Sequence, residues 1–256
     1  METLEVQTMG SVTTVTMNRP DVRNAFNPRL IEELLQVFSK PPTRIMVLGG
    51  AGTVFSAGAD LEWMKQSAEL DETQNREEAK RLASVFQTID ECEAVVIARV
   101  QGAAIGGGMG LVSCCDVVVA ESEAMFGFTE ARLGLAPAVI SPFVIRKIGL
   151  SAARRYFVTA QRFPAAEAMR IGLVHSVVDA SELDETTAKM VKRVAIGGPN
   201  AVLASKRLVR DIEGLDREQA IEHTSALIAG LRASEEGQEG LAAFLEKRPA
   251  RWIPNT

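Results

Sequence analysis

The sequence predicts an α/β protein that ends in a helical carboxyl-terminal region. Short apolar stretches at 45–48, 95–100 and 117–120 are separated by longer segments whose apolar residues recur at helical spacing. Strands that are apolar throughout are typical of sheets covered on both faces, and their alternation with helices is typical of α/β folds. After about residue 151 the pattern becomes helical almost throughout.

The first elements are predicted from residues 12–48. A strand at 12–17 carries alternating β-branched residues, and turn-forming residues follow at 18–21. A helix is predicted at 28–38, with Asn27 as its N-cap and a proline at its first position. The apolar stretch 45–48 then reads as a short buried strand that ends at two glycines.

The middle of the chain predicts one long helical stretch over 62–90. Its portion 71–81 is so highly charged that we expect it to face solvent, as a mobile flap would. Buried strands at 95–100 and 117–120 follow, with a glycine-rich segment between them. One further strand is predicted at 174–178. The remaining helices are predicted at 152–159, 165–171, 184–194, 201–212 and 216–231.

A domain boundary is predicted at the sequence Gly-Gly-Pro over 197–199. Residues 1–196 are expected to form the α/β core that binds substrate and carries catalysis. Residues 197–256 are expected to form a helical region that serves assembly of subunits.

Composition excludes several classes of function. The 256 residues are 46% hydrophobic and 24% charged, which is ordinary for a soluble globular protein. The net charge of −5, without a cluster of Lys and Arg, argues against a nucleic-acid partner. The amino terminus lacks the basic and apolar regions of a signal peptide, and no apolar stretch approaches the ~20 residues that span a bilayer. We therefore expect a cytoplasmic protein with no membrane partner.

Cysteine and histidine are sparse. Cys92, Cys114 and Cys115 suit buried thiols in a reducing compartment better than a disulfide framework. His175 and His223 lie far apart without ligand spacing around either, which argues against a metal site and against a Ser-His-Asp triad. We expect no metal and no cofactor.

Two segments, 55–61 and 101–110, each lead from an apolar strand through a glycine-containing turn into a helix. Glycine allows tight turns and close approach of the backbone to a ligand. Amides at a helix start are unsatisfied donors at the positive end of the helix dipole, and two of them aimed at one point would form an oxyanion hole. Glycines alone would serve close packing equally well. The second segment matches neither a Walker loop nor a dinucleotide fingerprint.

Three motifs together resemble the crotonase superfamily, which contains the enoyl-CoA hydratases and isomerases. They are 56–61 (SAGADL), 106–108 (GGG) and 126–135 (FGFTEARLGL), and the similarity extends to 19–20, 24–26 and 239–248. It therefore covers the whole chain in order. The resemblance implies a crotonase-like spiral of ββα units with a helical carboxyl-terminal region, assembly into homotrimers or homohexamers, and binding of acyl-CoA thioesters whose enolate is stabilised.

The same resemblance implies roles for particular residues. The amides of Ala59 and Gly107 would hold the thioester oxygen, and Glu130 would transfer the proton. A carboxyl group desolvated beside an acyl chain has a raised pKa and can both give and take a proton. Two-glutamate hydratases carry a second glutamate where this chain has Gly110, which would leave space for a ligand or for a neighbouring side chain. Asp60 opens a helix and also fits an N-cap.

CoA is part of the substrate rather than a separate cofactor. The family pattern places it between two stretches of this chain, which contain Val22, Arg23 and Ala25 on one side and Ala57, Asp60 and Leu61 on the other. Arg23 could meet a phosphate or remain a solvated surface residue. Phe244 and Lys247 in the closing motif resemble residues that reach the CoA of a neighbouring subunit.

The leading hypothesis is an enoyl-CoA hydratase with a single catalytic glutamate. The run 129–142 is similar to bacterial hydratases of branched-chain degradation, including methylglutaconyl-CoA hydratases. Val139 and Ile140 replace a glycine-rich stretch and would reshape the pocket, so we expect a branched or carboxylated acyl group. Trp63 and Met64 fit either that pocket or the core. The alternatives are a Δ3,Δ2-enoyl-CoA isomerase, which moves a proton between C2 and C4, and a non-catalytic CoA-binding protein on the same fold.

Overall fold

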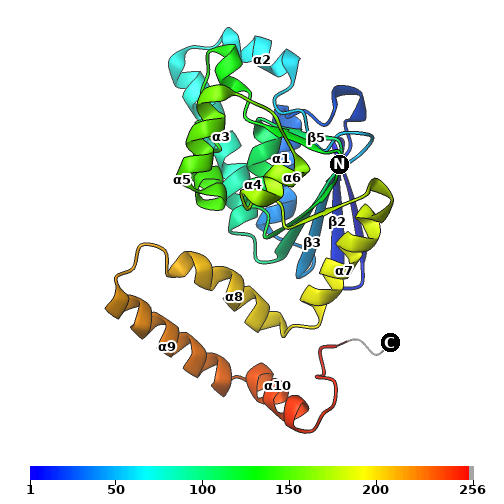
Figure 1. Ribbon diagram of the computed structural model, residues 1–256, viewed down its shortest axis with the longest axis vertical. Helices are drawn as coiled ribbons and strands as arrows, with labels where there is room; N and C mark the ends of the chain where they lie inside the picture. The colour runs from blue at the N-terminus through cyan, green and yellow to red at the C-terminus, as the bar shows by residue number, and fades with distance from the viewer. Residues whose placement is uncertain (254–256) are drawn as a thin grey trace. The chain divides into compact units, whose positions relative to one another are not determined.

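The computed structural model describes residues 1–253 and divides into two compact units, the first over 1–189 and the second from residue 190 onward (Figure 1). The first unit holds both β-sheets, and the second is helical. Helix α7 (Leu183–Ala195) runs across the division, which falls seven residues before the boundary expected from the glycines at 197–198.

The first unit is built on a six-stranded sheet with the order β1-β2-β3-β4-β6-β9. Strand β1 pairs antiparallel with β2, and every other neighbouring pair is parallel. The strands predicted at 12–17 and 95–100 are confirmed with the same bounds. The six strands span Leu4–Met9, Val12–Met17, Ile45–Gly50, Val95–Val100, Val117–Glu121 and Ser176–Val178.

A second sheet was not predicted from the sequence, because its strands are too short to show an alternating pattern of apolar residues. Strands β5, β7 and β8 span Ala103–Ile105, Met125–Gly127 and Phe163–Pro164. Two isolated bridges continue this layer, from Ala104 to Ser56 and from Ala59 to Phe26. The layer therefore brings the two glycine-containing turns side by side, although they are far apart in sequence.

Helix α1 (Pro28–Ser39) begins where the sequence predicts. The side chain of Asn27 accepts a hydrogen bond from the amide of Leu30, which confirms the predicted cap. Helix α1 packs against α3, α3 against α4, and α4 against α5 (Figure 1). Helices α4, α5 and α6 span Gly107–Cys114, Ser141–Thr159 and Ala165–Arg170.

The prediction of one helical stretch over 62–90 is wrong. The chain forms two helices instead, α2 (Leu61–Ala68) and α3 (Glu72–Asp90). Asp71 starts the second of them through a reciprocal capping box with Gln74, which satisfies amide donors that a continuous helix would have used internally. The charged first half of α3 is largely exposed, as expected from its composition.

The second unit contains helices α8 (Pro199–Asp211), α9 (Arg217–Ala233) and α10 (Glu235–Leu245). Helix α10 packs on α8 and α9. The carboxylate of Glu236 accepts hydrogen bonds from two amides in the first turn of α8, where the helix dipole favours a negative charge. The indole N–H of Trp252 donates to the carbonyl of Ile196 at 3.1 Å.

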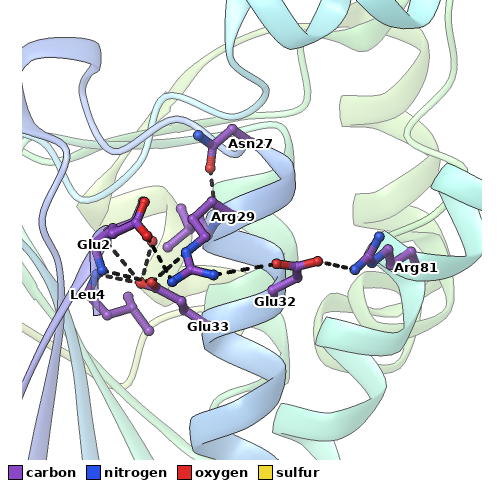
Figure 2. A network of polar contacts seen from close by, with 9 residues as sticks. Glu2, Leu4, Asn27, Arg29, Glu32, Glu33 and Arg81 are labelled. Atoms are coloured by element: carbon purple, nitrogen blue, oxygen red, sulfur yellow. Dashed lines mark hydrogen bonds and ion pairs between the residues drawn. The ribbon is translucent and has the colours of Figure 1, made fainter.

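A buried glutamate, Glu33, ties the amino-terminal segment to α1 (Figure 2). Its carboxylate accepts hydrogen bonds from the amides of Glu2, Thr3 and Leu4 and from the hydroxyl of Thr3, and it pairs with Arg29 at 2.9 Å. Burial by itself would raise the pKa of this carboxyl. The hydrogen bonds and the Arg29 charge outweigh burial and hold the pKa of Glu33 below its ordinary value.

The three cysteines are buried in the apolar interior, as predicted, and none forms a disulfide within residues 1–253. The buried core of the first unit is continuous from the main sheet to helices α1, α3, α4 and α5. No helix of the described chain is both long and apolar enough to cross a bilayer.

Candidate active site

A cavity of about 370 Å³ lies in the first unit, where the two glycine-containing turns meet the segment 129–140. Five of the predicted site residues line it: Ala57, Ala59, Leu61, Gly107 and Glu130. Residues predicted from motifs that are far apart in the sequence therefore line the same cavity.

The amides of Ala59 and Gly107, two residues that line this cavity, are unpaired donors. Neither amide donates a hydrogen bond to any residue within 1–253, whereas the amides of Asp60 and Gly106 donate to the carbonyls of Phe26 and Gly127. Gly107 is the first residue of α4, so its N–H has no acceptor in the preceding turn. Two unsatisfied donors in one apolar cavity can hold an oxygen that becomes negatively charged.

Glycine is required where the two turns touch. Gly58 has a φ of +94°, and a Cβ at this position would lie 3.0 Å from the carbonyl oxygen of Ile105 and 3.6 Å from the amide nitrogen of Gly107. A side chain would be strained there and would separate the turns. The glycine at 58 therefore keeps the two donors near one another.

An ion pair between the buried Asp60 and the half-buried Arg19 fixes the start of α2, two residues after Ala59. Asp60 is the N-cap, and its side chain accepts a hydrogen bond from the amide of Glu62. The guanidinium of Arg19 binds Asp60 at 2.8 Å and also donates to the carbonyl of Ala25. Burial would raise the pKa of Asp60, but the Arg19 hydrogen bond and charge hold it below the ordinary value. The predicted N-cap role of Asp60 is confirmed, and its carboxylate forms an ion pair with Arg19.

The segment 22–25 lies against the first glycine-containing turn. The carbonyl of Arg23 accepts a hydrogen bond from the amide of Ala57 at 2.9 Å, which sets the two predicted CoA-binding stretches side by side. Val22 and the Arg23 side chain are exposed, and Ala25 is buried. Asn24 was missed as a site residue. Its buried side-chain amide donates to two backbone carbonyls of residues 51–54 and closes this loop.

Glu130 begins a 3₁₀ helix, η2 (Glu130–Leu133), and lies beside the second glycine-containing turn. A Cβ on Gly106 would lie 3.4 Å from Oε1 of Glu130 and 3.8 Å from Cα of Gly58, so the carboxyl faces both turns. Its Oε2 is buried and has no hydrogen-bond partner in residues 1–253. Burial raises the pKa of Glu130 above its ordinary value. The site thus combines one partly buried carboxyl group with two backbone amides that have no acceptor within residues 1–253.

Gly110 is buried inside α4 and does not line the cavity. A Cβ at this position would lie 2.6 Å from Cγ2 of Ile140 and 2.6 Å from Cε1 of Phe86. Of the two expected uses of this glycine, space for a neighbouring side chain agrees with the structure. Space for a ligand does not, because apolar side chains from α3 and from the residue before α5 fill it.

The cavity wall also contains apolar residues whose role the sequence left open or did not indicate. Trp63 and Met64 of α2 line the cavity, and so do Leu82 of α3 and Phe26. The last two resemble ordinary core residues in the sequence, because helical periodicity does not distinguish a core face from a cavity face.

Two predicted CoA-binding residues belong to the second unit. Phe244 lies near the end of α10 with 81% of its surface exposed, and Lys247 is exposed just beyond the helix. Exposure leaves both side chains open to contact from another molecule, as the resemblance requires.

Known proteins identify the class to which this fold and site belong. The sequence model of the enoyl-CoA hydratase/isomerase family matches residues 7–255. The chain is 34% identical to the crotonyl-CoA hydratase of Syntrophomonas wolfei, over 93% of this chain and 92% of the relative. It is 33% identical to the short-chain-enoyl-CoA hydratase of Clostridium acetobutylicum, over 96% and 95%.

The fold agrees with the same class. The chain superposes on the crystal structure of an enoyl-CoA hydratase from Shewanella pealeana with a TM-score of 0.93, at 39% identity, over 98% of this chain and 96% of the other. The chain belongs to the enoyl-CoA hydratase/isomerase family and is an enzyme of that family. The predicted crotonase-like fold is therefore confirmed.

Proposed function

We propose that this enzyme adds water to a 2-enoyl-CoA thioester, with Glu130 as its one catalytic carboxyl and with Ala59 and Gly107 as its oxyanion hole. The observation that carries the proposal is the buried, unpartnered Oε2 of Glu130 in the cavity where two backbone amides also lack acceptors. Leaving buried polar groups unpaired costs stability, and such groups are expected where a ligand completes them.

One carboxyl is enough for the whole addition. The Glu130 carboxylate takes a proton from water as the water oxygen bonds to C3, and the electrons of the double bond move onto the thioester oxygen. The Ala59 and Gly107 amides stabilise this enolate. Protonated Glu130 then gives its proton to C2, so that water has been added and the carboxylate is restored. Burial raises the pKa of Glu130 above its ordinary value, which makes its carboxylate a stronger base for the first transfer.

The cavity wall supports an apolar, branched acyl group over a carboxylated one. Val139 and Ile140 contribute branched side chains, and Leu82 and Met64 add further apolar surface. No Lys, Arg or His side chain of residues 1–253 lines the cavity. A carboxylate on the acyl chain would therefore be buried without a counter-charge, which is costly.

The test is a hydration assay on straight, branched and carboxylated 2-enoyl-CoA thioesters. Loss of the conjugated thioester absorbance follows the reaction, and the mass of the product shows the added water. We expect the branched thioesters to be hydrated most efficiently and the carboxylated ones least. Absence of turnover on the entire panel would reject the proposal.

An isomerase that moves a proton between C2 and C4 is the second candidate, and Gly110 favours it. Phe86 and Ile140 occupy the space that a side chain at residue 110 would need, so Glu130 is the one acidic residue that lines the cavity within residues 1–253. A single carboxyl is sufficient for this proton shuttle. Incubation with a 3-enoyl-CoA decides between the two reactions, because isomerisation leaves the mass of the thioester unchanged.

We further propose that the enzyme is a cytoplasmic homotrimer or homohexamer that needs no metal or cofactor, and that its second unit serves assembly. Support comes from large exposed apolar side chains on that unit, including Val209, Phe244 and Leu245. Phe244 and Lys247 would meet the CoA of a neighbouring subunit. Light scattering should give a mass of three or six chains, and the double substitution Phe244→Asp and Leu245→Asp should lower it.

A further inference from the structure

Three apolar side chains pack on the face of α4 that carries Gly107 and Gly110. The two glycines are three residues apart, which places them on the same face, about 4.5 Å apart along the helix axis. A Cβ on Gly107 would lie 3.2 Å from the ring of Phe26. A Cβ on Gly110 would lie 2.6 Å from Cγ2 of Ile140 and 2.6 Å from Cε1 of Phe86. Apolar groups therefore cover this face within one helical turn of the Gly107 amide.

The three side chains differ in their relation to the cavity. Phe26 and Ile140 line it, whereas Phe86 and Gly110, which both lie against Cγ2 of Ile140, do not. Phe86 is completely buried, and its ring centroid lies 6.2 Å from that of Phe26. The cavity therefore ends at Ile140, with the Phe86 ring and the α4 backbone behind it.

The position of Ile140 is fixed by its surroundings. Its carbonyl accepts a hydrogen bond from the amide of Val144 at 3.0 Å, in the first turn of α5. On its other side, the amide and the hydroxyl of Ser141 both donate to the carbonyl of Ala138. The β-branched side chain is stiff at χ1, and the Phe86 ring fills the space into which it could retreat. A ligand that reaches Ile140 thus meets a rigid wall.

We propose that Ile140 limits how far an acyl chain extends past the reacting carbons, and so restricts the enzyme to short acyl groups. The thioester oxygen is assigned to the amides of Ala59 and Gly107, and the Ile140 wall stands within one turn of Gly107 on the same helix face. A straight chain that follows this face meets the wall early, whereas a branch close to the reacting carbons does not need the space beyond it. The inference rests on the proposed function only in that an acyl-CoA occupies the cavity with its oxygen at these amides.

Binding of saturated straight-chain acyl-CoA thioesters, from butanoyl to decanoyl, tests the proposal without requiring turnover. Calorimetry should show that the affinity of the wild type rises with chain length and falls once the chain reaches Ile140. Ile140→Ala opens the space as far as Phe86, so the fall should come about two methylenes later. Each methylene that becomes buried should tighten binding about fourfold. Chains just beyond the wild-type limit should therefore gain at least about tenfold, relative to butanoyl-CoA.

Two further variants separate this effect from a general loss of packing. Ile140→Val keeps a methyl group at Gly110 and removes only the terminal carbon, so it should fold readily and shift the length limit in the same direction by less. Val144→Ala is the matched control, because Val144 is completely buried on α5 and does not line the cavity. It should lower the free energy of unfolding, as Ile140→Ala does, and leave the length limit unchanged.

Three results would overturn the inference. They are a wild-type affinity that rises without a limit through decanoyl-CoA, an unchanged limit in both Ile140 variants, and an equal shift of the limit in Val144→Ala. Failure of hydration alone would reject the proposed reaction and leave the binding result standing. Absence of binding by every thioester of the series would reject both.

Discussion

Glu33 and Glu130 are both carboxyl groups with oxygens removed from water, and their surroundings differ. Glu33 accepts hydrogen bonds from three consecutive backbone amides and a hydroxyl, and it pairs with Arg29 (Figure 2). Glu130 has a buried oxygen with no donor in residues 1–253 and lines a cavity. The pKa of Glu33 is held below its ordinary value of 4.5, whereas burial raises the pKa of Glu130 above the same value.

The comparison shows how one residue type serves structure in one place and chemistry in another. Fixed donors stabilise the Glu33 carboxylate, so it stays ionised near neutral pH and acts as a structural link. The buried Oε2 of Glu130 has no donor within residues 1–253, and burial destabilises the ionised form, so proton exchange costs less there than at Glu33. The first arrangement increases the free energy of unfolding, and the second lowers it.

The largest expected effect is on activity. Glu130→Gln removes the proposed proton carrier and should lower kcat about 10³-fold. Glu33→Gln should leave kcat close to that of the wild type at a temperature where both variants are folded. The enoyl-CoA absorbance assay measures both variants. Retention of more than about a tenth of wild-type kcat in Glu130→Gln would contradict the assignment of Glu130.

The next effect is on stability. Glu33→Gln should lower the free energy of unfolding at neutral pH by about 2–3 kcal/mol, because the amide cannot reproduce the charge-assisted hydrogen bonds. The pKa of Glu33 is lower in the folded protein than its ordinary value of 4.5. Its contribution to the free energy of unfolding is therefore fully present above pH 4.5 and is lost as the pH falls through the folded-state pKa. Urea unfolding at neutral pH and at about pH 3 measures this difference. If wild type and Glu33→Gln differed in free energy of unfolding by the same amount at both pH values, the charge of Glu33 would not be the cause of the difference.

A smaller loss should follow from removing one donor to Glu33. Thr3→Val deletes the buried hydroxyl that lies 2.7 Å from Glu33 Oε2 and keeps the shape of the side chain. The free energy of unfolding should fall by about 1 kcal/mol, since the backbone donors remain. Thr14→Val is the control at an exposed site of β2, the strand that pairs with β1, where we expect a change within about 0.5 kcal/mol. Similar losses in both variants would mean that the loss comes from the introduced valine and not from the missing hydrogen bond to Glu33.

The smallest effect should have the opposite sign. The pKa of Glu130 is higher in the folded protein than its ordinary value of 4.5. Its favourable contribution to the free energy of unfolding is therefore present below pH 4.5 and is lost as the pH rises through the folded-state pKa. Glu130→Gln should therefore become more stable than the wild type at neutral and alkaline pH, by less than about 1 kcal/mol. Thermal unfolding across this pH range measures the difference. A constant difference at all pH values would show that Glu130 is not desolvated when ionised.

Local sequence patterns predicted the main sheet and several helices well. Strands β2 and β4 were predictable because their own residues alternate or are apolar throughout, and α1 because Asn27 and the following proline mark its start. The break between α2 and α3 was missed, although the Asp71 capping box that causes it is also local. The short strands β5, β7 and β8 could not be predicted, since two or three residues carry no period.

By itself the sequence determined which chemical groups are present and in what order: the glycine-containing turns, the single glutamate of the third motif, and the glycine in place of a second glutamate. Only the tertiary structure decided that Ala59 and Gly107 keep unpaired amides, that Phe86 and Ile140 fill the space beside Gly110, and that Trp63 shares a cavity with Glu130. The reason is physical. Each of these facts depends on packing between segments distant in the chain, which propensity and periodicity do not encode.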